Sequence, residues 1–223
     1  MSRLRAAAGM LVATLLASPA LAEATADYGP AFVAAFAEAC VPGRLSYNGT
    51  RATAASAGWT LTTVDAHAEL AEVMSRSEKG ALDPEMAEMD PAFEYEIYHR
   101  EVAGQQHYLI VSLASFDMAE KGEAPDRWVY NGCYLYNFDA AAPIDPAPVG
   151  ELTGKPIAAE INQDGMVSYT YGPPCPMPRT GDTYLTYVAD DSPHKAATGF
   201  SGLMMKFDTS VPEPGEIVPD TYC

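Results

Sequence analysis

The chain has 223 residues, of which 48% are hydrophobic and 19% are charged, a composition typical of a globular protein and not of a disordered chain or a coiled coil. Its 30 acidic side chains outnumber the 13 basic ones, which gives a formal net charge of −17. A polyanion of this size repels phosphate backbones and anionic headgroups, so nucleic-acid binding and peripheral membrane binding are disfavoured.

Residues 1–22 have the parts of a secretory signal peptide. Arg3 and Arg5 make a basic start, an apolar run follows, and small residues before Glu23 offer a cleavage site after Ala22. The apolar run is shorter than the ~20 residues that span a bilayer. We therefore expect a periplasmic or secreted product without a membrane anchor, forming a single α+β domain over residues 23–223.

Residues 27–80 follow a helical pattern. Phe32, Phe36 and Cys40 are spaced four residues apart, so they share one face of a helix, and Pro42-Gly43 is typical of a helix end. This first helix is expected to bury its apolar face.

Two further helices are predicted in the same region. Thr50 is suited to capping a short alanine-rich helix that ends at Gly58. Asp65 is suited to capping a third helix, which Lys79-Gly80 closes with a basic residue and a glycine.

From Phe93 onward the hydrophobic period changes toward two, which indicates strands. The run 107–116 is almost continuously apolar, as expected of a central strand, whereas proline-rich stretches between strands indicate loops at 140–150, 172–178 and 211–219. The predicted fold is α+β, with N-terminal helices packed on a mainly antiparallel sheet of about six to seven strands. The expected strands cover residues 93–98, 107–116, 128–138, 157–161, 166–171, 184–188 and 200–207.

All four cysteines lie after the signal peptide. An even number of cysteines in an oxidising compartment indicates two disulfides, and their spacing does not fit a zinc site. Among the three possible pairings we favour Cys40–Cys133, which joins the first helix to a central strand, and Cys175–Cys223, which fixes the C-terminal tail to a proline-rich loop.

Two acidic side chains on one strand are the main catalytic candidates. Glu94 and Glu96 share a strand face with Cβ atoms ~7 Å apart, a separation used by the carboxylate pairs of glycosidases. His99, the third candidate, points to the opposite face. The alternative is an ordinary solvated surface, and no His-Glu-x-x-His or Gly-x-Ser-x-Gly motif is present.

Methionine and histidine residues suggest a metal site as a third possibility. Met86 and Met89 have the Met-x-x-Met spacing of thioether sites that select Cu(I) in an oxidising compartment, and His107 is a further candidate ligand, alone or facing His99 across a hairpin. The alternative is that these methionines fill gaps in a core, and we expect no bound cofactor.

Aromatic residues alternate along the predicted strand 128–138. Trp128, Tyr130, Tyr134 and Tyr136 share one face of it. If helices cover this face, the rings belong to the core. This interpretation is favoured, because the predicted helices must pack their apolar faces against a sheet. If the face is open, the rings form a patch for a glycan, a peptide or a protein partner.

These patterns favour a non-catalytic envelope protein that binds an unidentified periplasmic protein, peptide or glycan. A cell-wall hydrolase with a carboxylate acid/base is the first alternative. Copper handling through methionine and histidine is the second.

Overall fold

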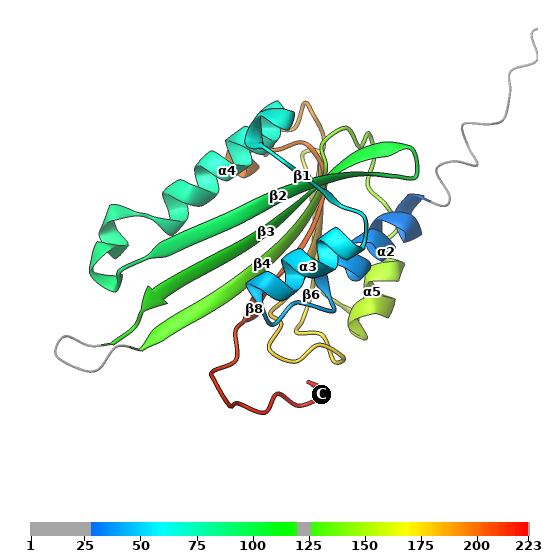
Figure 1. The fold of residues 1–223 in the computed structure, drawn as a ribbon. Helices are drawn as coiled ribbons and strands as arrows, with labels where there is room; N and C mark the ends of the chain where they lie inside the picture. The colour runs from blue at the N-terminus through cyan, green and yellow to red at the C-terminus, as the bar shows by residue number, and fades with distance from the viewer. Residues whose placement is uncertain (1–27, 120–125, 223) are drawn as a thin grey trace, which may run out of the picture.

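The computed structural model describes residues 28–119 and 126–222 of the chain (Figure 1). The predicted signal peptide, residues 1–22, lies outside the described residues. No helix within the two described ranges is long and apolar enough to cross a membrane.

A single antiparallel sheet of eight strands forms the centre of the fold, in the order β1-β2-β3-β4-β8-β7-β6-β5. The α+β class is therefore confirmed, but the predicted number of six to seven strands is too low. All seven expected strands form, and the additional strand, β1, lies within the region for which only helices were predicted. The strands are β1 (Thr60–Thr62), β2 (Ala92–Val102), β3 (Gln105–Asp117), β4 (Arg127–Asn137), β5 (Ile157–Gln163), β6 (Met166–Tyr171), β7 (Thr183–Val188) and β8 (Gly202–Ser210).

The sheet consists of two antiparallel meanders joined side by side. Strands β1 to β4 follow one another in space as they do in sequence, and β8 to β5 run in the reverse order. The last strand, β8, pairs with β4, and this pairing joins the two meanders into one sheet. This pairing places β4 and β8 in the middle, where their side chains can be covered on both faces.

The three predicted helices are present as α2 (Tyr28–Cys40), α3 (Tyr47–Ser56) and α4 (Ala68–Ala81). The helices are not confined to the N-terminal part, because α5 (Ala147–Thr153) and α6 (Lys195–Thr198) lie between later strands. Helix α5 begins at the end of a stretch predicted to be a loop. Proline is tolerated in the first turn of a helix, and here Pro146 is the N-cap of α5 and Pro148 lies in its first turn.

Two predicted helix caps are wrong by a few residues. Ser46, not Thr50, caps α3, and its side chain accepts a hydrogen bond from the backbone N–H of Gly49 at 3.2 Å. His67 caps α4 through its Nδ1 atom, while Asp65 lies in a preceding 3₁₀ turn. Serine outranks threonine as a cap, so the earlier position begins α3.

Helices cover both faces of the sheet (Figure 1). Helices α2, α3 and α5 pack on one face, against buried side chains such as Leu109 and Leu135. Helix α4 packs on the other face through Leu70, next to Ile110 and Tyr136. Since alternate residues of β3 face these two layers, the continuous apolar run predicted for a central strand is explained.

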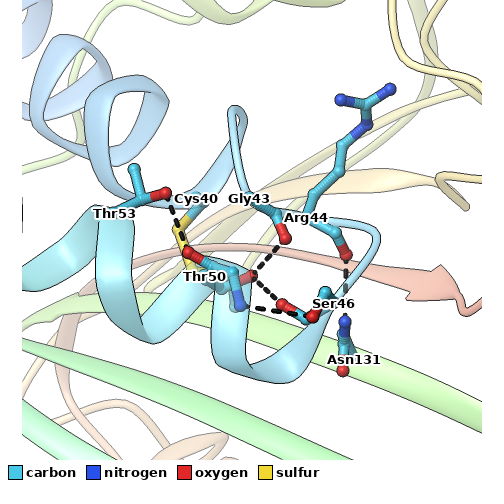
Figure 2. Close-up of a disulfide and its surroundings, with 9 residues drawn as sticks. Cys40, Gly43, Arg44, Ser46, Thr50, Thr53 and Asn131 are labelled. Atoms are coloured by element: carbon cyan, nitrogen blue, oxygen red, sulfur yellow. Dashed lines mark hydrogen bonds between the residues drawn. A yellow bond between two sulfur atoms is a disulfide. The ribbon is translucent and has the colours of Figure 1, made fainter.

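A buried disulfide between Cys40 and Cys133 joins the end of α2 to β4, as predicted (Figure 2). Beside it, the side-chain amide of Asn131 donates a hydrogen bond to the carbonyl of Arg44 at 3.1 Å. This bond fixes the turn between α2 and α3 to the same strand.

The predicted Cys175–Cys223 pair includes Cys223, which lies outside the described residues, so this pairing stays a prediction. The neighbouring backbone fits it, because the N–H of Tyr222 donates a hydrogen bond to the carbonyl of Cys175 at 2.6 Å. The end of the chain therefore returns to the loop that carries Cys175.

Candidate functional site

A groove of about 1090 Å³ lies where β4 begins and β8 ends, and the C-terminal tail forms one of its walls. We call it the Trp128 groove. Its floor and walls include Trp128, Tyr130, Arg179, Asp208, Ser210 and Pro212.

Trp128 is a half-exposed aromatic residue that lines this groove, with 47% of its surface accessible. Its ring lies 6.4 Å from the ring of Tyr130, which in turn stacks on Phe116 at 5.7 Å. The indole N–H of Trp128 donates to a carboxylate oxygen of Asp126 at 3.3 Å. The indole edge is thus held by a hydrogen bond while much of the ring stays open to solvent.

Tyr134 connects the groove to the sheet interior. Its hydroxyl donates to Asp208 at 2.7 Å, and burial together with the charge of Asp208 raises the pKa of this phenol well above its usual value. Lys206 lies between the rings of Tyr134 and Tyr184, at 5.4 and 5.2 Å from their centroids. Tyr134 is therefore a fixed, protonated donor that orients the carboxylate of Asp208.

Arg179 fixes the wall formed by the C-terminal tail. Its guanidinium donates to both carboxylate oxygens of Glu216 and, at 3.1 Å, to the hydroxyl of Ser210. Hydrogen bonds from Arg179 lower the pKa of Glu216. Arg179 therefore connects the tail, through its ion pair with Glu216, to the end of β8, through its hydrogen bond to Ser210.

The structure separates the four aromatic residues that the sequence placed on one face. Tyr136 is only 5% exposed and packs against Phe138 and Phe200 beneath the α4 layer. Burial raises its pKa strongly. Tyr136 therefore belongs to the core, whereas Trp128 and Tyr130, at the other end of the strand, line the groove.

The acidic pair Glu94 and Glu96 does lie on one face of β2, as the pairing register shows. Glu96 accepts hydrogen bonds from Arg51 and Tyr98, and the hydrogen bond from Arg51 lowers its pKa. A general acid needs the opposite shift, a raised pKa. Glu96 therefore acts here as the partner of an arginine in α3.

His99 lies on the other face of β2, where it pairs with Tyr108 across the hairpin. The side-chain amide of Gln106 lies 3.4 Å from its Nδ1 atom. His107 pairs with Arg100 and so faces away from His99. The predicted facing pair of histidines does not form.

Of the three candidate metal ligands, His107 lies far from the two methionines. Met86 and Met89 belong to the 3₁₀ turn η2 (Pro84–Met89), just before β2 begins, whereas His107 lies opposite Arg100 near the far end of β2. Eight residues of strand correspond to ~26 Å. Within the described part of the chain, no group of three or more His, Cys, Asp or Glu side chains could hold a metal ion.

Both nitrogens of His107 already have protein partners. Its Nδ1 atom lies 2.8 Å from the carbonyl of Gln105 and its Nε2 atom 2.8 Å from the hydroxyl of Tyr28. Burial lowers the pKa of His107 to about 4. This histidine is a neutral part of the core that connects the start of α2 to the sheet.

Sequence reasoning missed the polar walls of the groove. Arg179, Asp208 and Ser210 come from a loop and the last strand, which are more than 40 residues from Trp128 in sequence. Only the aromatic alternation along β4 indicated the site. Comparison with protein-family models, with curated proteins and with solved structures finds no match for the chain.

Proposed function

We propose that the protein is a non-catalytic binding protein of the bacterial envelope, exported through its N-terminal signal and stabilised by disulfides. Its ligand, a peptide, a glycan or a segment of a partner protein, occupies the Trp128 groove. The observation that carries this proposal is the half-exposed Trp128 on the floor of a groove of about 1090 Å³, because an aromatic ring with fixed polar neighbours is typical of recognition sites.

The compartment is supported by the Cys40–Cys133 disulfide. Disulfides persist in oxidising compartments and are rare in the cytosol. The acidic character of the chain fits a soluble envelope protein, since its charge opposes binding to anionic lipids.

Arrays of immobilised peptides and glycans test this function. The natural chain should bind a subset of spots, and Trp128→Ala should lose those spots while its melting temperature changes by no more than about 2 °C. Ile161→Ala is the matched control, because Ile161 is also an exposed hydrophobic side chain, at 45%, but lies on the edge strand β5. Binding that is equal in the natural chain and in Trp128→Ala would refute the proposal.

A further inference from the structure

We propose that the ligand of the Trp128 groove is a cationic peptide segment, with a lysine or arginine side chain lying over the open face of Trp128. This inference rests on the proposed binding function and adds the chemical class of the ligand.

The cations that line the groove are already neutralised by the protein itself. Arg127 donates to Asp90 at 2.9 Å, and Arg179 is held by Glu216. Neither guanidinium is available to an anionic ligand without breaking an existing ion pair.

The acids that line the groove are less completely paired. Across residues 28–119 and 126–222, no lysine or arginine forms an ion pair with Asp126 or Glu213. Within these same ranges, the indole N–H of Trp128 is the only hydrogen-bond donor to the side chain of Asp126. Two carboxylates therefore lie at the groove without a cationic partner among the residues that the structure describes, and one of them, Asp126, is hydrogen-bonded to Trp128.

The chain repeatedly places cations over aromatic rings. Arg100 lies over the ring of Trp59 at 4.8 Å, and Arg51 lies over that of Tyr47 at 5.1 Å. Among the described residues no cation lies over Trp128. Tryptophan has the aromatic face that attracts cations most strongly, so a cation from a ligand is the group that fits this open ring beside Asp126.

Size and long-range charge point to a peptide rather than to a small amine. A groove of about 1090 Å³ is slightly larger than the sites that typically hold drug-sized ligands, so it has room for several residues. The formal charge of −17 attracts basic ligands and repels acidic ones over long distances.

Fluorescence titration tests this inference, because Trp59 and Trp128 are the two tryptophans of the chain. In Trp59→Phe the emission reports on Trp128 alone. The probes are a blocked hexapeptide of alternating lysine and proline, its glutamate counterpart, and chitotriose. Calorimetry on the natural chain repeats each titration, so that the result does not depend on how well Trp59→Phe folds.

We expect saturable binding of the lysine peptide alone, which weakens about tenfold from ~25 to ~300 mM salt as screening increases. Trp128→Ala should weaken it about thirtyfold, the effect of an aromatic hot spot. Asp126→Asn with Glu213→Gln should also weaken it. The pair Glu101→Gln with Glu151→Gln removes the same charge from exposed positions on β2 and α5 and should leave binding unchanged.

Each contrary outcome has a distinct meaning. Binding of chitotriose or of the glutamate peptide that Trp128→Ala abolishes would overturn the cationic class and keep the proposed function. Lysine-peptide binding that both charge pairs weaken equally would show general attraction to the acidic surface and overturn the inference. If no probe binds and the arrays are also blank, the inference and the proposed function both fail.

Discussion

The ring of Tyr134 lies across Gly132, two residues earlier on the same strand. A methyl group at position 132 would come within 2.7 Å of the Tyr134 hydroxyl oxygen and 2.5 Å of the Ser112 hydroxyl oxygen. A glycine in a central strand ordinarily weakens it, but an aromatic ring over the bare backbone compensates for the missing side chain. Gly132 thus allows Tyr134 to reach Asp208 at the Trp128 groove.

Gly132→Ala should therefore destabilise the fold by about 1–3 kcal/mol, the usual cost of overpacking, and displace Tyr134 from Asp208. Chemical denaturation measures the first effect, and the tyrosine ring signals in NMR spectra report the second. Gly172→Ala is the control, because nothing lies within 4 Å of its added methyl group. Equal stability of the two variants would contradict the packing seen at Gly132.

The two ends of the aromatic row on β4 should respond differently to truncation. Tyr136→Ala removes a ring that is 5% exposed and should cost about 3–5 kcal/mol, as for other large buried rings. Trp128→Ala removes a ring that is 47% exposed and should change the free energy of unfolding by only about 0.5 kcal/mol. Urea unfolding of both variants measures the contrast, and a large loss for Trp128→Ala would mean that this ring serves stability.

Much of the fold follows from local patterns. The spacing of Phe32, Phe36 and Cys40 predicted α2, and the continuous apolar run of β3 predicted a central strand. The pairing of Cys40 with Cys133 followed from the same assignment of helix and strand. These features depend on periodicity, which neighbouring residues in sequence determine.

Other features depend on partners that are distant in sequence. Strand β1 has only three residues and exists because Thr60 to Thr62 pair with β2, so no period reveals it. The walls of the Trp128 groove form because Arg179 binds Glu216 and Ser210. Whether Tyr136 is buried or open depends on where α4 lies, and the sequence left both possibilities in place.

Protonation of His107 should make the fold less stable in acid. Burial, with the nearby charge of Arg100, lowers the folded-state pKa of His107 to about 4, while the unfolded value is about 6.5. The folded protein favours the neutral ring, so between pH 4 and pH 6.5 the unfolded state binds more protons than the folded state. The free energy of unfolding therefore falls as the pH falls from about 6.5 through 4. Full protonation of His107 should lower the free energy of unfolding by about 3 kcal/mol.

Denaturation midpoints measured from pH 7 to pH 4 check this effect. Carboxylates also titrate in this range, so the comparison is with His107→Gln, which has no ring to protonate. The stability of the natural chain should fall more steeply with acid than that of His107→Gln. Parallel curves would show that His107 does not contribute to the pH dependence.

The disulfide Cys40–Cys133 closes a sequence separation of 93 residues. On the chain-entropy account, a loop of this length corresponds to about 4–5 kcal/mol. Cys40→Ala with Cys133→Ala should lower the free energy of unfolding by this order, as measured in urea. A loss below about 1 kcal/mol would mean that the unfolded chain gains little freedom when this link is absent.

The proposed export and maturation of the protein give a prediction for both ends of the chain. Expression in a bacterial host with an intact export pathway should yield a periplasmic product that begins at Glu23, because cleavage is expected after Ala22. Intact mass and N-terminal sequencing measure the first residue. Peptide mapping without reduction should then find Cys40–Cys133 and Cys175–Cys223 and no alkylated cysteine. A product that keeps Arg3 and Arg5 and remains in the cytosol would remove the basis for the compartment, and two alkylated cysteines in the native protein would refute the second bridge.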